Sequence, residues 1–211
     1  MTPVLVALPK GRLFDQAIDL LMRSGVKVRQ NAMDSRKLTF ADEEQHFSFI
    51  SLKPADVPVY VESGAADCGI VGSDVLREVE YRVYEPIDLQ IGRCRMVVAA
   101  PEGAGLSPER HLKIATKYPR TAERHFLERS AHIHVVRLEG SVELAPLLGL
   151  ADAIVDLVES GRTLRDNHLV VVEDVAAVSA RLIVNRTSMK MKARGINGLI
   201  SQLDRVVYAA H

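Results

Sequence analysis

One stretch of the chain decides the fold class, and it reads Val142-Glu-Leu-Ala-Pro-Leu-Leu-Gly-Leu-Ala-Asp-Ala-Ile-Val-Asp-Leu-Val-Glu-Ser-Gly-Arg-Thr-Leu164. Its first part, 142–148, has the apolar spacing of a helix and stops at Gly149, a residue type that commonly ends helices. The apolar run 153–158 predicts a buried strand, and a short polar loop follows at 160–163. A helix that leads into a buried strand and then a loop is typical of an α/β fold.

The same alternation extends outward from this stretch in both directions. Helical patterns occur after residue 12, where Gly25 ends the helix, and at 57–62, 73–76, 121–129 and 196–209. Apolar and β-branched runs predict strands at 4–8, 47–52, 68–72, 96–100, 113–116, 133–138 and 180–185, and residues 26–28 are expected to begin a further strand. The alternation predicts an α/β fold with largely parallel strands.

An internal similarity points to two related halves. At a constant separation of 85 positions, Val57, Gly64, Ala66 and Asp67 match Val142, Gly149, Ala151 and Asp152. Shared secondary structure alone can produce such a match. We predict two lobes, each a mostly parallel sheet flanked by helices, with a cleft between them. Lobe I comprises 1–93 and 178–211, and lobe II comprises 94–177.

The composition restricts the class of protein. The 211 residues include 27 basic and 27 acidic side chains, and 47% of the residues are hydrophobic. A chain of this length can bury its own core. Proteins that bind duplex nucleic acid usually carry a basic surplus, so we expect no nucleic-acid partner.

The cysteines and the N-terminus indicate a reduced, cytoplasmic protein. Cys68 and Cys94 are too few for a disulfide framework or a metal site, and Cys68 lies in an apolar run typical of a buried residue. The sequence begins without a secretory signal pattern. No window approaches the roughly 18 apolar residues of a membrane span. We therefore expect a cytoplasmic protein without a membrane partner.

The loop after the predicted strand 153–158 has the composition of a phosphate-binding loop. Ser160 and Thr163 supply hydroxyls, and Gly161 lets the backbone approach an anion. Asp156 and Glu159 lie just upstream and could accept hydrogen bonds from ribose hydroxyls. An ordinary strand-to-helix turn explains the loop alone equally well, so both interpretations remain open at this level.

Two basic segments are candidate anion sites. Lys10, Gly11 and Arg12 follow the first predicted strand at its carboxyl end, where open α/β sheets bind ligands. Ser35-Arg-Lys-Leu38 offers a second basic pair. Taken alone, each segment is better explained as exposed charge on a turn.

The remaining ionisable groups give weaker signals. His132 and His134 alternate on a predicted strand, but no third metal ligand is evident among the seven histidines, so we expect solvent-facing histidines and no metal site built by the protein. A basic stretch runs through Arg181, Arg186, Lys190, Lys192 and Arg194. It is either solvated surface or a surface for a partner.

These features coincide in one family. The run Leu138-Glu-Gly-Ser-Val-Glu-Leu-Ala-Pro-Leu-Leu-Gly-Leu-Ala-Asp-Ala-Ile-Val-Asp-Leu-Val-Glu-Ser-Gly-Arg-Thr-Leu164 closely resembles the signature of the ATP phosphoribosyltransferase family. Supporting segments are Leu8-Pro-Lys-Gly-Arg-Leu13, Ser35-Arg-Lys-Leu38, Asp56-Val-Pro-Val-Tyr-Val-Glu-Ser-Gly64, Ala66-Asp-Cys-Gly-Ile-Val-Gly-Ser-Asp-Val-Leu76 and Arg181-Leu-Ile-Val-Asn185.

The resemblance implies an activity and a fold. The family transfers phosphoribosyl from 5-phosphoribosyl diphosphate to N1 of the adenine of ATP and releases diphosphate, the first step of histidine biosynthesis. Its two lobes resemble type II periplasmic binding proteins, with the active site in the cleft between them. Mg²⁺ would arrive bound to substrate.

The resemblance also implies residue roles. By matched position, Glu143, Asp156 and Glu159 would hold the ribose, and Ser160, Gly161, Arg162 and Thr163 its 5-phosphate. The catalytic cations near the diphosphate and the ATP phosphates would be Lys10, Arg12 and Arg36. Gly11, Lys53 and Asp74 lie in matching segments and would contact ATP. Serine at 160 replaces the more usual threonine and still supplies a hydroxyl.

The length at which this sequence stops implies a subtype. Long members of the family carry a C-terminal regulatory domain, for which no residues remain after His211. The chain therefore resembles the short form, which works in a hetero-oligomer with a regulatory subunit related to histidyl-tRNA synthetase. Feedback inhibition by histidine, an allosteric control, would then require that partner.

Three other functions are weighed against this one. A two-lobe binding module would capture a small molecule without reaction, but the paired acids before Ser160 argue against it. A purine or pyrimidine salvage phosphoribosyltransferase would share the phosphate loop, but typically has two adjacent acids and a Thr-Gly pair. A structural subunit would not concentrate acids and cations at strand ends.

Overall fold

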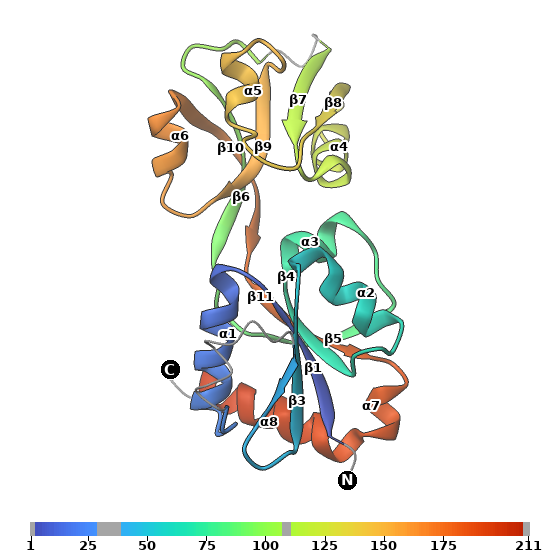
Figure 1. The fold of residues 1–211 in the computed structure, drawn as a ribbon. Helices are drawn as coiled ribbons and strands as arrows, with labels where there is room; N and C mark the ends of the chain where they lie inside the picture. The colour runs from blue at the N-terminus through green and yellow to red at the C-terminus, as the bar shows by residue number, and fades with distance from the viewer. Residues whose placement is uncertain (1–2, 29–38, 107–110, 209–211) are drawn as a thin grey trace. The chain divides into compact units, whose positions relative to one another are not determined.

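The computed structural model describes residues 3–28, 39–106 and 111–208 and shows two compact units (Figure 1). Unit 1 consists of Met1–Leu76, Glu80–Gly92 and Ser179–His211, and unit 2 of Arg77–Val79 and Arg93–Val178. The chain enters unit 2 through one strand and leaves through another, so unit 1 is built from both ends of the sequence.

The sheet of unit 1 has the strand order β2-β3-β1-β4-β11-β5. Three consecutive strands, β3, β1 and β4, are parallel, and Pro9 at the end of β1 is in register with Leu52 at the end of β3. The others pair antiparallel. The bounds are β1 (Val4–Pro9), β2 (Thr39–Ala41), β3 (Phe47–Leu52), β4 (Cys68–Gly72), β5 (Val83–Asp88) and β11 (Ala180–Asn185).

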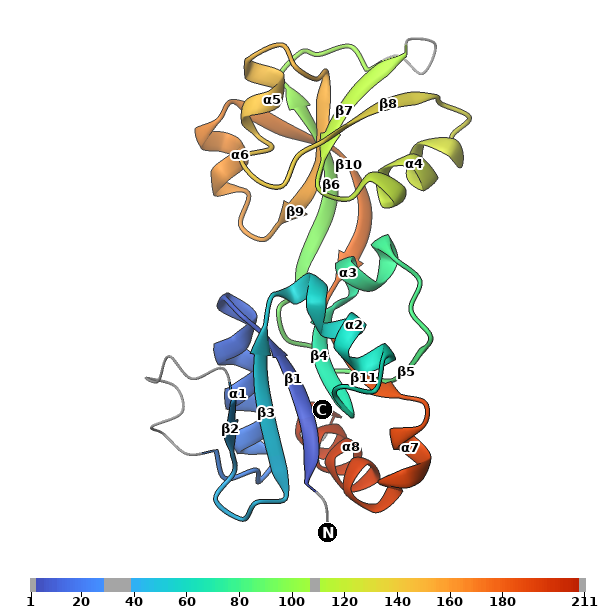
Figure 2. The same ribbon diagram turned by 45° about the vertical axis from the view of Figure 1, so that its right-hand side comes forward.

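Helices cover both faces of this sheet because its strands alternate apolar side chains between the two faces. One face packs against α1 (Arg12–Arg23) and α8 (Ala193–Tyr208), with Val6, Leu8 and Phe49 in the shared core. The opposite face packs against α2 (Val57–Glu62) (Figure 2). The short helices η2 (Pro54–Asp56) and α7 (Ser188–Met191) and the first four residues of α3 (Ser73–Glu78) complete the unit.

The sheet of unit 2 has the order β10-β6-β9-β7-β8, in which β9, β7 and β8 are parallel. Helix α4 (Pro119–Leu127) packs on one face, and α5 (Leu144–Leu147) and α6 (Arg162–Asp166) pack on the other. The strands are β6 (Cys94–Pro101), β7 (Leu112–Thr116), β8 (Ile133–Arg137), β9 (Ala153–Val158) and β10 (Leu169–Val178).

The expected parallel pairing therefore applies to three consecutive strands in each sheet, and both sheets are mixed. In unit 2 the antiparallel pair β6–β10 consists of the strands by which the chain enters and leaves, so they run in opposite directions. Within the described residues, which stop at Val28 and resume at Thr39, 26–28 are not part of a strand. Val28 makes an isolated bridge to Asp42. The apolar pattern at Val26 and Val28 reflects their packing into the core.

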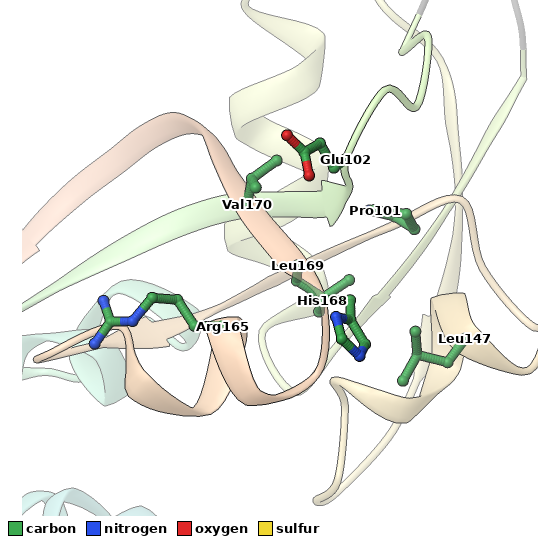
Figure 3. Close-up of a pocket in the computed structure, with 7 residues that line it drawn as sticks. All are labelled: Pro101, Glu102, Leu147, Arg165, His168, Leu169 and Val170. Atoms are coloured by element: carbon green, nitrogen blue, oxygen red, sulfur yellow. The ribbon is translucent and has the colours of Figure 1, made fainter.

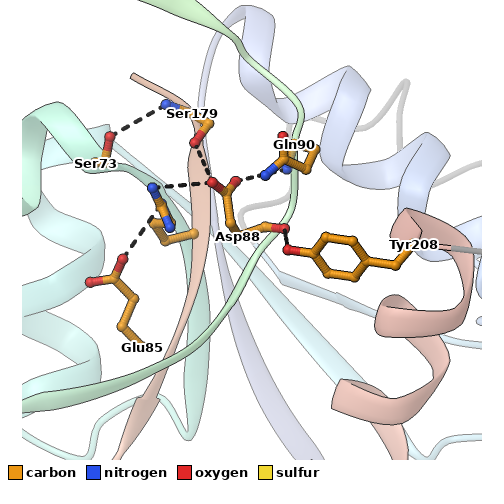
Figure 4. Close-up of polar contacts among 7 residues, drawn as sticks. Ser73, Glu85, Asp88, Gln90, Ser179 and Tyr208 are labelled. Atoms are coloured by element: carbon orange, nitrogen blue, oxygen red, sulfur yellow. Dashed lines mark hydrogen bonds and ion pairs between the residues drawn. The ribbon is translucent and has the colours of Figure 1, made fainter. Parts of the chain in front are cut away.

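Asp88 holds together the segments of unit 1 that lead to and from the second unit (Figure 4). Its Oδ2 accepts a hydrogen bond from Ser179 Oγ at 3.0 Å and forms an ion pair with the guanidinium of Arg181 at 3.1 Å. Ser179 also donates its N–H to Ser73 Oγ at 3.3 Å, and its carbonyl accepts from Ser73 N at 2.9 Å. The start of α3 is thereby fixed beside the start of β11.

Candidate functional site

Unit 1 gathers candidate residues at the carboxyl ends of its three parallel strands. Lys10 and Lys53 follow directly after β1 and β3, and Lys10 N donates to Leu52 O at 2.7 Å, which continues the pairing of the two strands. Both lysine side chains are exposed. Asp74 follows β4, the other parallel neighbour of β1. The sequence-predicted residues Lys10, Gly11, Arg12, Lys53 and Asp74 thus lie on one edge of this sheet.

Gly11 allows the chain to turn from β1 into α1. Its φ of 87° and ψ of −159° place it in a region that only glycine adopts without strain, and an added Cβ would meet no atom within 4 Å. The glycine is therefore required by backbone conformation, and it places Arg12 at the first position of the helix. The third predicted cation, Arg36, lies outside the described residues.

Asp74 is buried in the first turn of α3. Its carboxylate packs so closely over Gly72 that a Cβ at position 72 would overlap Oδ1. Ser73 is held by its two hydrogen bonds to Ser179. The position of the Asp74 carboxylate therefore depends on a glycine before it and a fixed serine.

Unit 2 also places candidate residues at the carboxyl end of a parallel strand, β9. Glu159 and Ser160 follow the strand, and Gly161 has a φ of 71°, in the left-handed region, at the start of α6. Ser160 Oγ accepts from Arg162 N at 3.4 Å. Beyond Arg162 N, the first backbone N–H groups of α6 have no acceptor within the helix and can donate to an anion. Glu159 also lies 85 positions after Asp74, at the equivalent strand end.

Asp156 lies in a charged environment near the end of β9. Burial raises the pKa of its carboxyl group and Glu143 raises it further, whereas a hydrogen bond from Leu157 N at 2.7 Å and the charge of Lys117 oppose this shift. Glu143 lies at the start of α5, immediately before its first residue. The charge of Glu143 therefore acts on Asp156, which indicates that the two carboxyl groups share one neighbourhood in unit 2.

Lys117 is a candidate residue that the sequence analysis missed. It follows Thr116, whose register partner on β9 is Val155, so Lys117 lies beside Asp156 across the parallel pair β7–β9. Lys117 directly follows β7, the central strand of the three parallel strands, and so has the same position in unit 2 as Lys10 has after β1 in unit 1. The signal in the sequence was a lysine directly after an apolar strand, but only the strand order pairs it with Asp156.

Arg165 is a second residue without an assigned role in the sequence analysis. Its guanidinium donates to Ser160 O at 3.2 Å and so ties α6 to the loop before it. Arg165 also lines a pocket of about 410 Å³ together with Leu147 and His168 (Figure 3). The loop 160–163 is thus supported from within α6.

The other sequence signals do not form a site. His132 and His134 are exposed, and the ring of His132 stacks on that of His111 with centroids 6.5 Å apart. Within residues 3–28, 39–106 and 111–208, no group of three or more His, Cys, Asp or Glu side chains could hold a metal ion. In the same part of the chain, no helix is both long enough and apolar enough to cross a membrane.

Comparison with known proteins identifies clear relatives. A family model described as HisG, ATP phosphoribosyltransferase, matches residues 53–205. The ATP phosphoribosyltransferase of Oceanobacillus iheyensis is 48% identical over 207 residues, which cover 98% of this chain and 100% of the relative. That of Clostridium novyi is 48% identical over 210 residues, which cover 98% and 99%.

Comparison with solved structures finds a member of the same family and a protein that shares only the fold. The ATP phosphoribosyl transferase (HisG:HisZ) complex from Thermotoga maritima contains a chain with a TM-score of 0.83 and 33% identity, over 97% of this chain and 98% of that one. The arginine-bound form of truncated ArgBP from T. maritima has a TM-score of 0.59 and 13% identity, over 97% and 96%. At that identity the second likeness concerns the fold alone, a two-lobe fold of the periplasmic-binding-protein type.

Proposed function

The chain belongs to the ATP phosphoribosyltransferase family, which catalyses the first step of histidine biosynthesis, and we propose that its loop 160–163 holds the 5-phosphate of 5-phosphoribosyl diphosphate. The observation that carries this proposal is the left-handed Gly161 between Ser160 and the first turn of α6. Gly161 turns the chain between the strand and α6, and the four residues 160–163 at this turn supply hydroxyl groups and backbone N–H groups. Such a set suits a phosphate dianion.

The acids around the loop suit the ribose. Asp156 and Glu143 share one neighbourhood, and Glu159 directly precedes Ser160. Ionised carboxylates only accept hydrogen bonds, and the 2- and 3-hydroxyl groups of ribose can donate them. We assign these three carboxylates to the ribose ring.

The cations of unit 1 suit the diphosphate and the phosphates of ATP. Lys10 and Arg12 flank Gly11 at the carboxyl end of β1, with Lys53 beside them at the end of β3. As the bond between C1 of ribose and the diphosphate oxygen breaks, the electron pair leaves with diphosphate and negative charge develops there. Cations stabilise that charge, while the neutral N1 of adenine supplies the electron pair of the new bond and requires no prior deprotonation.

Orientation is the remaining task of the protein. Both substrates are large anions, and the protein must hold C1 of ribose and N1 of adenine in line for the transfer. We assign Gly11, Lys53 and Asp74 to ATP. Mg²⁺ would enter with the diphosphate as a substrate-bound ion and neutralise part of its charge, in keeping with its preference for phosphate oxygens and water.

We also propose that the chain works with a separate regulatory subunit that resembles histidyl-tRNA synthetase and confers inhibition by histidine. Support comes from the Thermotoga maritima relative, which is part of a HisG:HisZ complex, and from relatives that this chain covers almost completely. A cytoplasmic location would suit a reaction that consumes ATP.

The assay for this proposal uses the purified chain with ATP, 5-phosphoribosyl diphosphate and Mg²⁺, with and without the regulatory subunit. Diphosphate release and the mass of the nucleotide product are measured. We expect release with ATP and none with free adenine, guanine or uracil. Release with a free base would indicate a salvage enzyme, and no release under any condition would overturn the proposed function.

The residue assignments need their own measurement. Thr163→Val and Ser160→Ala should raise the KM for 5-phosphoribosyl diphosphate and leave the KM for ATP unchanged. Equal effects on both KM values would contradict the assignment of the loop to the donor phosphate.

A further inference from the structure

Charge is segregated along the C-terminal part of this neutral chain. Residues 175–203 contain no Asp or Glu but include five basic residues. Arg181 is engaged with Asp88, and Lys192 with Asp67 at 2.6 Å. Within the described residues, Lys190 and Arg194 are exposed and have no ion-pair partner. Their charge therefore remains available at the surface.

Lys190 and Arg194 lie on the rim of a groove in unit 1. The groove has a volume of about 730 Å³ and is lined by residues of α7, of α8 and of the segments where β1 and β3 begin. Its apolar lining includes Val4, Phe47 and Leu199. It lies at the amino-terminal ends of the strands, whereas Lys10, Lys53 and Asp74 follow their carboxyl ends. The groove is therefore separate from the proposed substrate residues.

Two further features suit a protein partner. Met191 also lines the groove, and 80% of its surface is exposed, which is a large exposure for an apolar side chain beside a concave surface. Gly198 lines the groove from α8, and a Cβ added there would meet no atom within 4 Å. Glycine in a helix interior costs stability, yet here it leaves the groove open.

We propose that this groove docks an acidic segment of the regulatory subunit that inserts an apolar side chain between Lys190 and Arg194. The proposal rests on the regulatory partnership proposed above and specifies where that partner binds. An apolar floor with a cationic rim matches an apolar anchor flanked by carboxylates.

A second copy of the chain fits the groove less well. Two basic rims would repel each other across a two-fold axis, so the groove cannot be self-complementary. A copy could reach it only through a different surface, and such head-to-tail contacts form rings or open filaments. A separate partner protein is subject to neither of these two restrictions.

The test measures the affinity of the full chain for the purified regulatory subunit by titration calorimetry. The double variant K190E/R194E should bind at least about tenfold more weakly than the wild-type chain, and wild-type affinity should fall as salt rises. The matched control R23E/R82E makes the same change of charge on exposed residues outside the groove and should bind normally.

The glycine offers an uncharged test. Gly198→Phe should fill the groove and weaken binding, whereas Gly198→Ala should bind as the wild-type chain does. All four variants should keep the basal transfer to ATP because none alters a proposed substrate residue.

The outcomes separate this inference from the proposed function. Loss of binding in K190E/R194E and Gly198→Phe with basal transfer retained supports the groove. Normal binding by both variants overturns the docking site, as does a wild-type chain that does not bind the regulatory subunit. If the chain alone self-associates in a salt-dependent manner and K190E/R194E abolishes this association, then a second copy occupies the groove. That result would also overturn the proposed docking of the regulatory subunit. Absence of diphosphate release by the wild-type chain both with and without the regulatory subunit is instead a failure of the proposed function.

Discussion

Asp67 and Asp152, which belong to different units, make the same pair of hydrogen bonds with a neighbouring strand. Asp67 donates its N–H to Leu5 O at 2.9 Å and accepts from Leu5 N at 2.8 Å through Oδ2. Asp152 does the same with Lys113, at 2.8 and 2.7 Å. The two residues are 85 positions apart, and the helix-ending Gly64 and Gly149 both have positive φ. The internal similarity in the sequence therefore has a structural basis.

The two aspartates should nevertheless differ in their contribution to stability. Asp67 is buried and also accepts from Lys192 Nζ and Ser188 Oγ, whereas Asp152 is exposed. Asp67→Asn should lower the free energy of unfolding by about 3 kcal/mol, because it leaves a partly buried lysine without its counter-ion. Asp152→Asn keeps an acceptor for Lys113 N and should cost under about 1 kcal/mol. Urea denaturation measures both, and equal losses would contradict this explanation.

The phosphate loop has a matched internal control. Gly161 and Gly149 both lie in unit 2 with φ near 70°, so alanine at either position should cost about 1 kcal/mol of stability through backbone strain. Only Gly161→Ala should also raise the KM for 5-phosphoribosyl diphosphate, by about tenfold, because it displaces groups that we assign to the phosphate. If Gly149→Ala raised this KM to a similar extent, the effect of Gly161→Ala would be explained by lost stability alone.

Asp156 should lower stability at neutral pH while serving binding. Burial, reinforced by Glu143, raises its carboxyl pKa, so the folded state holds the proton more tightly than the unfolded state. The free energy of unfolding must then fall as pH rises from the ordinary aspartate pKa through the raised value. Asp156→Asn, which keeps an acceptor for Leu157 N, should raise Tm at about pH 7 and give little gain below the ordinary aspartate pKa, about 3.9. It should also weaken binding of 5-phosphoribosyl diphosphate. A lower Tm at neutral pH would contradict the electrostatic account.

Lys117 should act through the ionisation of Asp156. Its charge lowers the pKa of that carboxyl group, so Lys117→Met should move the acidic limb of the kcat/KM profile for 5-phosphoribosyl diphosphate to higher pH. Lys117→Arg keeps the charge and should leave the limb in place. A loss of activity in Lys117→Met that is uniform across pH would instead indicate direct contact with substrate.

Much of the architecture was predictable because the parallel strands are continuous apolar runs. The predicted strands at 68–72 and 153–158 match the parallel strands β4 and β9, and the prediction at 180–185 matches β11, which pairs antiparallel. Strand β5 was missed because three of its six residues are exposed in succession and one of them is Pro86, so it lacks an apolar run. Strand β10 was missed because its exposed valines and acidic residues follow neither period, and two irregularities in register interrupt its pairing with β6. Antiparallel pairing at sheet edges depends on contacts distant in the sequence.

The candidate site was predictable only in part. The loop 160–163 and its upstream acids were recognisable because they are contiguous in sequence. The pairing of Lys117 with Asp156 was not, because it arises from the order in which β7 and β9 lie in the sheet. The support that Ser179 and Gly72 give to Asp74 likewise requires the folded chain. The role of Arg36 stays a prediction, since that residue lies outside the described residues.

Ala66-Asp67 and Ala151-Asp152 directly precede β4 and β9, and candidate substrate residues directly follow the ends of these two strands. In both units these aspartate contacts therefore lie at one edge of the sheet, and the candidate substrate residues lie at the other. Natural variation can strengthen or weaken the first edge without disturbing the second. A lineage that needs a more heat-resistant enzyme, or one that must tolerate a costly change in specificity, can accumulate compensating substitutions there while its chemistry stays intact.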